Sequence, residues 1–508
     1  MMTQQEHKRM TAIERRIKEI AKEEGLLTTE IIFEVVPARR MIEAMAYHFP
    51  TNYSHWTFGR DYDRIRTIYE HTGGGIPYEV VWNFETPRAF LVASNPFALN
   101  VLTIAHVYGH VDHFLRNSYF KHGRSFGDIA EEARYAADKF RHYESVYGRE
   151  EVERLLDSAI SIQWQQHPDP FYEEQDEEQV RAYLLRMEME KLSSLQQGSA
   201  DVRKAEEGRI RACETRLKEL RHKTPPEPVF DIQKYIIDHA PRLEDWERDV
   251  LTLFRNQARA LAPNRRIHLL AEAFAVRAHT RIMRRLFEEK LLTAEEHGVY
   301  NTFHSKVTQA SRGDLNVYHV GPALLDYVEM CWDKGRFGKE YEECTNLKQK
   351  ERWDTGAMQG RAKIFEIADR YTDRMAVEEF FTDEFIHGMQ LYFYEGELDE
   401  ETDEIVYTIV EDDPAVIRHL LKSAYTLYDI PLPAVVDGNH NDRGELYLRH
   451  YYNGRELLPQ YRNGVLMQIG YQWRRPVHLE TVTEGKTKLF SYDGSKHMEQ
   501  QLLIFPGK

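Results

Sequence analysis

One apolar stretch of the chain, Ile104–Phe114, carries two histidines four residues apart, His106 and His110. In a helix, side chains at positions i and i+4 leave the same face one turn apart, the spacing at which two imidazoles can share one metal ion. A zinc peptidase with this motif has a Glu directly after the first His, where it acts as the general base. Here that position is Val107. The stretch therefore predicts metal-binding geometry without the usual catalytic carboxylate.

A second apolar helix is predicted at Arg265–Leu286, and it contains Glu272 and His279. Because these residues are seven positions apart, they project from one face, two turns apart. A carboxylate in so apolar a stretch is costly to bury unless something such as a cation pairs with it. The same helix has small residues that let another helix approach closely, namely Ala273, Ala275 and Ala278.

In one class of zinc peptidases, two histidines on one helix are completed by a Glu from a later helix, in a motif like Asn-Glu-Gly-Phe-Ala. The segment Ala271–Ala275 keeps the Glu and has Ala at the Asn and Gly positions. We therefore expect His106, His110 and Glu272 to bind one divalent ion, with His279 as a fourth ligand or as a partner of a ligand. Zinc and iron both suit two nitrogens and a carboxylate.

The alternative is that these histidines are structural. Two histidines occur at this spacing by chance, and a His on an apolar helix face is commonly a hydrogen-bonded core residue. Glu272 also follows His110 at a much longer distance in the sequence than is usual in that peptidase class.

Three further polar residues are candidates for a site. Glu79 is on a predicted strand next to the His helix, where it either replaces the missing catalytic base or is an ordinary strand carboxylate. His55 is in a predicted loop, a placement that favours a site role, and the alternative is a structural His-Trp corner. Asp112 points to a different helix face from the His pair, so we expect it to hydrogen-bond a loop rather than a metal.

The charge, cysteine content and hydropathy of the chain exclude several classes of protein. The net charge of −16 argues against binding to nucleic acid or an anionic membrane, because both need a basic surface. The cysteines form no Cys-x-x-Cys pair, so neither a disulfide framework nor a cysteine zinc site is predicted. No apolar run is long enough to span a membrane, and the charged N-terminal segment has no apolar signal core. We therefore expect a cytoplasmic protein with no nucleic-acid or membrane partner.

The hydrophobic pattern predicts a mainly helical fold, with a small β-hairpin next to a zincin-like helix pair and a smaller strand-rich α+β C-terminal domain. The hairpin is predicted from strands at 77–84 and 89–93. Strands are also predicted at 404–411, 444–450, 465–469, 478–482 and 487–492. We divide the chain into four parts: an N-terminal part with the hairpin and the His helix (1–164), a charged helical insertion (165–228), a helical part with the Glu272 helix (229–398) and the α+β domain (399–508).

The insertion at 165–228 differs in character from its surroundings. It begins with acidic residues, has apolar residues at heptad-like spacing from Ile210 to Leu220, and ends in a Pro-rich segment at 225–228. This pattern predicts a solvated helical hairpin. The alternative is a docking arm for a helix of a partner protein.

Several blocks of the sequence, in one order, resemble the stage V sporulation protein R (SpoVR-like) family. These blocks are Tyr53–Arg60, Tyr78–Asn83, Ile104–Phe114, Tyr147–Gly148, Glu272–His279 and Pro476–Val482. The chain departs from the family pattern at Val111–Phe114, where members tend to have Cys-Asp-Phe-Phe, at Ala271 and Ala273, which replace Asn and Gly, and at Leu315–Tyr318, where Pro is expected before Tyr. The resemblance implies a cytoplasmic protein linked to sporulation and spore cortex formation, and it brings no settled biochemical activity.

Two functions are consistent with these features. The first is a metal-dependent amide or peptide hydrolase in cell-wall or spore-coat processing, with metal-bound water as the nucleophile and Glu79 or another carboxylate as the base. The second is a non-enzymatic regulator whose metal site, of degenerate zincin type, is structural and whose 165–228 region docks a partner. Val107 favours the second function. Structural metal sites tend to be closed by four protein ligands, whereas catalytic sites leave a position for water.

Overall fold

A computed structural model of the chain describes residues 4–47, 55–71, 79–124, 129–167, 169, 171–173, 175–197, 204–312, 315–399, 404–427 and 430–502. Tyr53, Ser54 and Tyr78, which belong to the blocks that resemble the SpoVR-like family, lie outside these residues. The chain forms two compact units that interleave along the sequence. Unit 1 consists of residues 1–135 and 259–429, and unit 2 of residues 136–258 and 430–508.

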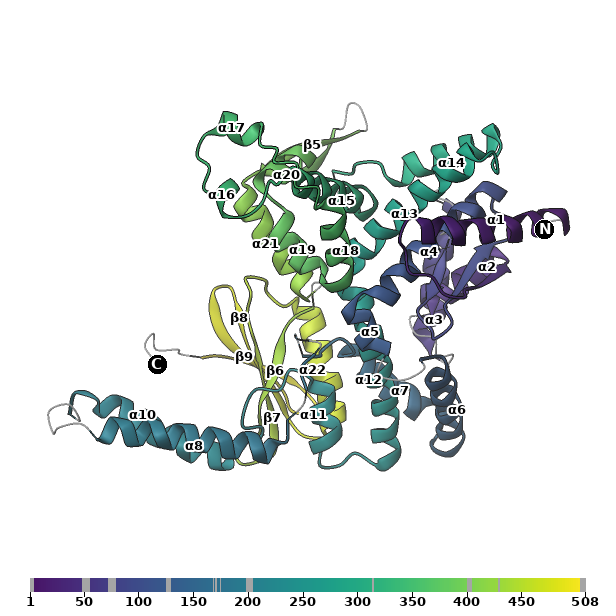
Figure 1. Ribbon diagram of the computed structural model, residues 1–508. Helices are drawn as coiled ribbons and strands as arrows, with labels where there is room; N and C mark the ends of the chain where they lie inside the picture. The colour runs from purple at the N-terminus through teal and green to yellow at the C-terminus, as the bar shows by residue number, and fades with distance from the viewer. Residues whose placement is uncertain are drawn as a thin grey trace. The chain divides into compact units, whose positions relative to one another are not determined.

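Unit 1 is mainly helical, with two small sheets (Figure 1). Its helices are α1 (Gln4–Glu23), α2 (Ala38–Ala46), α3 (Trp56–His71), α4 (Phe97–Arg116), α5 (Ser118–Arg124), α13 (His268–Glu288), α14 (Ala294–Val307), α15 (Val317–Asp333), α16 (Lys339–Glu342), α17 (Leu347–Glu351), α18 (Gly360–Arg370), α19 (Asp373–Phe380), α20 (Asp383–Met389) and α21 (Pro414–Leu427). Its strands are β1 (Ile32–Val36), β2 (Val80–Trp82), β3 (Arg88–Val92), β4 (Phe393–Asp399) and β5 (Glu404–Glu411). Two more helices, α6 (Ile129–Tyr147) and α12 (Asp245–Arg266), cross the sequence boundary between the units.

Helix α4, which carries the His pair, is the central helix of unit 1. Almost every side chain from Ala98 to Phe114 is buried, and the helix contacts α1, α13 and α14. A helix that is apolar on all sides is typical of a buried core helix. The few polar side chains of α4 must therefore find partners inside the unit.

Helices α4 and α13 pack closely because small residues face one another. A Cβ at Gly109 of α4 would lie 2.6 Å from the Cα of Ala275 and 2.9 Å from the Cβ of Ala278 in α13. In α15, a Cβ at Gly321 would lie 2.7 Å from the Cβ of Ala273. Atoms do not approach so closely without displacement, so each of these glycines allows a contact that a larger residue would prevent. The prediction that the alanines of α13 allow close helix approach is confirmed.

The start of α13 is fixed by a carboxylate from another helix. Asp373, buried in α19, accepts hydrogen bonds from the backbone amides of His268, Leu269 and Leu270 at 2.7, 2.8 and 3.0 Å. These amides have no partner within the helix, and a negative charge at a helix N-terminus also stabilises the helix dipole. The helix therefore begins at His268 rather than at the predicted Arg265.

The predicted hairpin is present, but it belongs to a larger sheet. Strands β2 and β3 pair antiparallel, as predicted. On its other side β3 pairs parallel with β1, so the order is β1-β3-β2. No strand was predicted from the sequence at β1. Strand β3 is the central strand, and its residues after Arg88 are buried.

Unit 2 combines helices with a five-stranded sheet of order β10-β9-β8-β7-β6. Its helices are α7 (Arg149–Ser161), α8 (Glu177–Gln196), α10 (Glu207–His222), α11 (Ile232–His239) and α22 (Pro459–Trp473). Its strands are β6 (Pro433–His440), β7 (Glu445–His450), β8 (Val477–Thr483), β9 (Lys486–Tyr492) and β10 (His497–Gln501). The strand-rich C-terminal region is thus confirmed.

One predicted strand is wrong, because residues 465–469 lie in helix α22. A short apolar run occurs both in buried strands and in buried helices, and its period alone does not separate the two. Here Pro459 begins a helix in which Leu466, Ile469 and Trp473 are buried. Their spacing of three and four residues places them on one helix face, where they pack against β8, β9 and α7.

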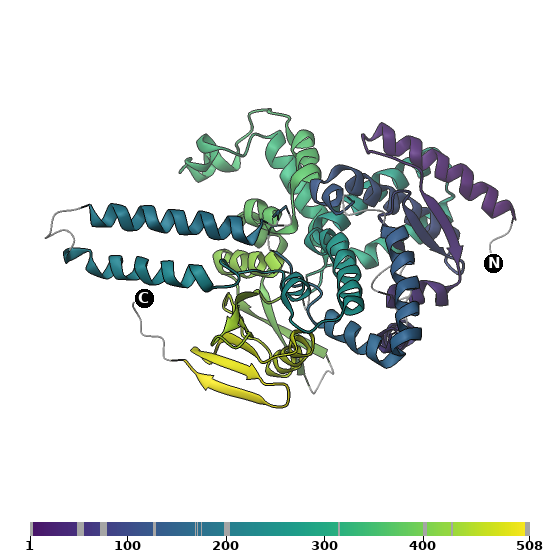
Figure 2. The ribbon, with the colours of Figure 1, turned by 90° about the horizontal axis from the view of Figure 1, so that it is seen from below.

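The charged insertion contains a helical hairpin, as predicted. Helices α8 and α10 lie side by side in both views (Figures 1 and 2). Cys213, Leu217 and Leu220 of α10 are buried, whereas no residue of α8 is. A docking role for this hairpin, and the division of the chain into four parts, stay predictions. No helix among the described residues is long and apolar enough to cross a membrane.

We predict that limited proteolysis cuts first within 165–228 or at Gly396–Asp399, and only later within 265–286. The described residues of the first two regions are mostly exposed or half-buried, whereas most of α13 is buried, and proteases cleave where the chain opens locally. A time course with a protease of broad specificity, followed by mass spectrometry, measures the order. Early cuts inside 265–286 would contradict this order of cleavage.

Candidate metal centre

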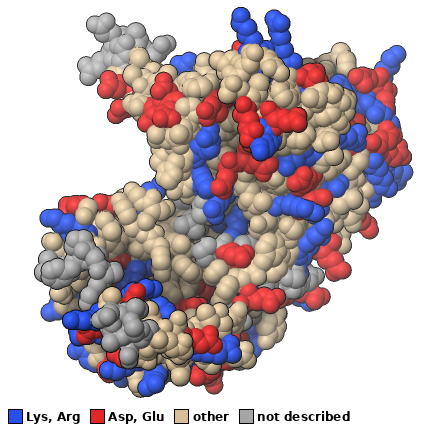
Figure 3. All heavy atoms as spheres, turned by 60° about the vertical axis from the view of Figure 1, so that its left-hand side comes forward, with Lys and Arg blue, Asp and Glu red and all other residues tan. Residues whose placement is uncertain are grey.

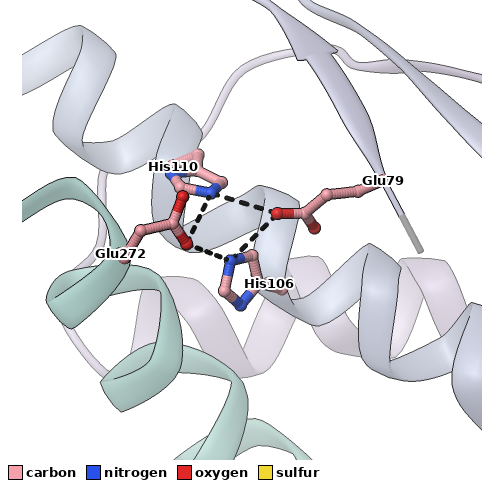
Figure 4. Close-up of side chains that lie close together, drawn as sticks. All are labelled: Glu79, His106, His110 and Glu272. Atoms are coloured by element: carbon pink, nitrogen blue, oxygen red, sulfur yellow. Dashed lines mark hydrogen bonds and ion pairs between the residues drawn. The ribbon is translucent and has the colours of Figure 1, made fainter. Parts of the chain in front are cut away.

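Four side chains from three elements of unit 1 meet at one place (Figure 4). They are His106 and His110 of α4, Glu272 of α13 and Glu79, which directly precedes β2. Each residue offers one ligand atom, and these four atoms all lie within 4.8 Å of one another, so the group could hold a metal ion. No other group of this kind occurs among the described residues.

The two imidazoles direct their Nε2 atoms at the two carboxylates. Nε2 of His106 lies 3.1 Å from Oε1 of Glu79 and 3.3 Å from Oε2 of Glu272. Nε2 of His110 lies 3.3 Å and 3.7 Å from the same two oxygens. The cluster therefore has alternating nitrogen and oxygen atoms, with both His Nε2 atoms pointing inward.

The cluster is almost completely buried, and its groups shift one another's pKa values. The His106 side chain is fully buried, and the two carboxylates are each 12% exposed. Burial by itself would raise the pKa of Glu79, but the charge and hydrogen bonds of His106 and His110 hold that pKa at about 2. Burial would lower the pKa of His106, but Glu79 and Glu272 raise it to about 10. The two carboxylates thus require positive charge next to them.

One carboxylate oxygen of the cluster has no partner. Oε2 of Glu79 is buried and accepts no hydrogen bond from any described residue. An unsatisfied buried carboxylate oxygen is costly, because it has lost its hydration without replacement. A cation bound at the cluster would balance the negative charge that both oxygens of Glu79 share.

A second histidine contacts the ring nitrogen of His106 that points away from the cluster. Its Nδ1 lies 2.8 Å from Nδ1 of His279, whose Nε2 lies 3.1 Å from Nδ1 of His304. Burial, with nearby His106 and His304, holds the pKa of His279 well below its usual value. A neutral His279 can accept a hydrogen bond at Nδ1 from Nδ1–H of His106 and donate one from its own Nε2–H to Nδ1 of His304. The Nε2 of neutral His106 then directs its lone pair into the cluster, and a metal-binding His commonly donates its other ring N–H in this way.

The structure therefore brings together three of the residues that were predicted as ligands, and Glu79 is grouped with them. His106, His110 and Glu272 converge, with Glu79, predicted as a base, beside them. His279 contacts His106 and is not one of the four grouped residues. The part played by His304 of α14 was missed, and this partly exposed His in a polar helix gives no sequence signal.

Two other predicted candidates lie outside the cluster. Asp112 accepts a hydrogen bond from the backbone amide of Leu27, in the loop after α1, at 2.7 Å and pairs with Arg116. His55 is buried just before α3, and its Nδ1 lies 2.6 Å from Oγ1 of Thr57. Neither residue belongs to the metal-binding group.

Val107 is fully buried in the apolar core of unit 1. The position that holds the general base in a zinc peptidase is here part of the packing of α4. A carboxylate introduced there would be buried among apolar side chains.

Comparison with known proteins adds a family to this geometry. The family profile described as SpoVR like protein matches residues 4–430, and the profile described as SpoVR-like C-terminal domain matches residues 434–484. The chain is similar to "Uncharacterized protein YcgB" of Escherichia coli (strain K12), with 24% identity over 497 residues, which cover 92% of this chain and 91% of that protein. No solved structure matches the chain. All four residues of the cluster lie within the first match.

We predict that Gly109→Ala destabilises the protein and disturbs the cluster, because the added methyl meets the backbone of Ala275. The expected loss in the free energy of unfolding is about 1–3 kcal/mol. The matched control is Gly298→Ala in α14, where the added methyl meets nothing within 4 Å and helix propensity predicts a gain of up to about 1 kcal/mol. Chemical denaturation measures both. Equal effects of the two changes would mean that the α4–α13 contact is not tight.

Proposed function

This chain belongs to the SpoVR family, and we propose that Glu79, His106, His110 and Glu272 bind one divalent metal ion. The observation that carries the proposal is the set of N···O separations in the cluster, which run from 3.1 to 3.7 Å. A tetrahedral site with metal–ligand bonds of about 2.0–2.1 Å has edges of about 3.3–3.4 Å. The four N···O separations therefore match the edges of a tetrahedral site, and the remaining two separations are within 4.8 Å.

Zinc or iron(II) is the ion that this donor set favours. Two imidazoles and two carboxylates suit both metals, whereas a site for magnesium or calcium would consist of oxygen ligands. The unpartnered oxygen of Glu79 and the His279 contact behind His106 support the same assignment.

We infer that the ion is structural, in a site of degenerate zincin type, and that the protein acts as a regulator rather than a hydrolase. Four protein ligands close a tetrahedral site and leave no position for a reactive water. Val107 also occupies the place of the usual base. The cytoplasmic location, the docking of a partner through 165–228 and the link to sporulation and spore cortex formation remain part of this proposal, on the basis of sequence and family resemblance.

A metal-dependent amide or peptide hydrolase in cell-wall or spore-coat processing is the second candidate, and one observation favours it. Glu79 lies before a strand rather than in a helix, and its Oε2 accepts no hydrogen bond from the residues that the structure describes. If Glu79 leaves the ion when substrate binds, a water can take its place and Glu79 can act as the general base.

We predict that purified protein contains about one equivalent of zinc or iron, measured by elemental analysis, and that chelation lowers its melting temperature. His106→Ala and His110→Ala should remove the metal, and His279→Ala should weaken binding about 10–100-fold. The control is His450→Ala, a buried His of unit 2 that contacts Thr481 and should leave the metal content unchanged. Protein that gains neither metal nor stability after anaerobic reconstitution with either ion would refute the site. In an endospore-forming host, the same variants test the link to cortex formation.

Glu79→Gln distinguishes the structural site from the catalytic one. For a structural site, we predict that the variant binds metal more weakly than the wild type and that neither of them hydrolyses peptides or muropeptides. For a catalytic site, wild-type protein hydrolyses such a substrate and the variant, assayed with metal bound, loses that activity by about 10²–10⁴-fold. The measurement pairs metal content with product analysis by mass spectrometry.

A further inference from the structure

The hairpin of β4 and β5 in unit 1 exposes apolar side chains that its own unit does not cover. Leu398 is 60% exposed, Ile405 56% and Ile409 48%. The apolar core of the unit includes residues up to Tyr392 and begins again at Ile417 in α21, with no member from the hairpin among the described residues. Isolated two-stranded hairpins are at best marginally stable in water, so this one is expected to be completed by a further contact.

The register of the hairpin places apolar residues on one face and both glutamates of β4, beside the exposed Val406, on the other. Residues paired across the strands share a face, and the pairs Leu398–Ile405, Gly396–Tyr407 and Tyr394–Ile409 form the apolar face. A Cβ at Gly396 would lie 2.8 Å from Ile405 and 3.2 Å from Tyr407, so these side chains lean over the glycine. The opposite face carries the pairs Glu395–Thr408 and Glu397–Val406.

The charge of this segment is of one sign. Between Leu391 and Asp413 the sequence has ten Asp or Glu residues and no Lys, Arg or His. Elsewhere, on the face drawn in Figure 3, charges of both signs are interspersed. Glu395 and Glu397 make no ion pair with any described residue, and the nearby cations of α21, Arg418 and Lys422, pair with Asp383 and Glu378. Arg312 lies over the ring of Tyr394 at the base of the hairpin.

The edge of the hairpin is open as well. The sheet has the order β4-β5, with no third strand among the described residues. The outer edge of β4 therefore presents unpaired backbone groups beside Glu395, Glu397 and Leu398. An added strand would place alternate side chains on the two faces, beside the acidic residues and beside the apolar ones.

We propose that the β4–β5 hairpin docks an extended segment of a partner protein in which basic and apolar residues alternate, added as a third strand along β4. Its Lys or Arg side chains lie beside Glu395 and Glu397, and its apolar side chains extend the face of Leu398 and Ile405. A second copy of this chain fits the edge poorly, because pairing two acidic hairpins brings like charges together. The proposal is independent of the metal site.

The test uses the full chain and a labelled peptide of about ten residues in which Lys and Val alternate. We expect saturable binding in fluorescence anisotropy that weakens with salt, and none with the corresponding Glu-Val peptide. Glu395→Lys with Glu397→Lys should weaken binding by about tenfold or more. The control pair, Glu340→Lys with Glu343→Lys, makes the same change in net charge at two exposed residues in α16 and the turn after it. This control should change peptide binding less than about twofold.

Two further measurements separate strand addition from non-specific attraction. Methylation of alternate peptide amides removes the donors that a third strand needs, so the methylated peptide should not bind. Leu398→Ser with Ile405→Ser should also weaken binding, with the fold checked by circular dichroism. Failure of the Lys-Val peptide to bind, equal binding of the methylated peptide, or equal losses in the two Glu→Lys pairs would overturn the proposal. Self-association in sedimentation that Leu398→Ser with Ile405→Ser abolishes would also overturn it, because a second copy would then cover the face.

Discussion

Two carboxylates and two imidazoles share a nearly dry space between β2, α4 and α13, and they need a positive charge among them. Without an ion, that charge is a proton on His106, whose pKa the carboxylates raise to about 10. A proton satisfies one nitrogen and leaves Oε2 of Glu79 with no hydrogen bond from the described residues. A divalent ion neutralises both carboxylates at once and uses the Nε2 lone pairs, which already point inward. A single bound ion would therefore supply the positive charge that the two buried carboxylates need.

The position of these groups depends on backbone packing more than on the groups themselves. The contact of Gly109 with Ala275 and Ala278 sets how closely α4 and α13 approach, and so where Glu272 lies relative to the histidines. The carboxylate of Asp373 fixes where α13 begins. Since side chains on a helix follow its start and rotation, one buried Asp on α19 acts on the cluster without touching it.

The parts of the site that depend on helical period could be predicted from the sequence. The spacing of His106 and His110, and the small residues around Glu272, follow from one helix at a time and could be read directly. Glu79 was predicted next to the His helix as a base, but its grouping with the ligand set and the pairing of β1 with β3 could not be predicted, because both depend on contacts between segments far apart in the sequence. The error at 465–469 has a different cause, since a short apolar run has no period that separates strand from helix.

A closed metal site in such a position has a physical use even without catalysis. Glu79, the His pair and Glu272 come from three separate stretches of the chain, and the sequence between His110 and Glu272 includes much of unit 2. An ion that binds all of them closes long loops, which lowers the entropy of the unfolded chain and stabilises the fold. The proposed cross-link does not depend on position 107, where a buried Val stands in place of the general base of a zinc peptidase.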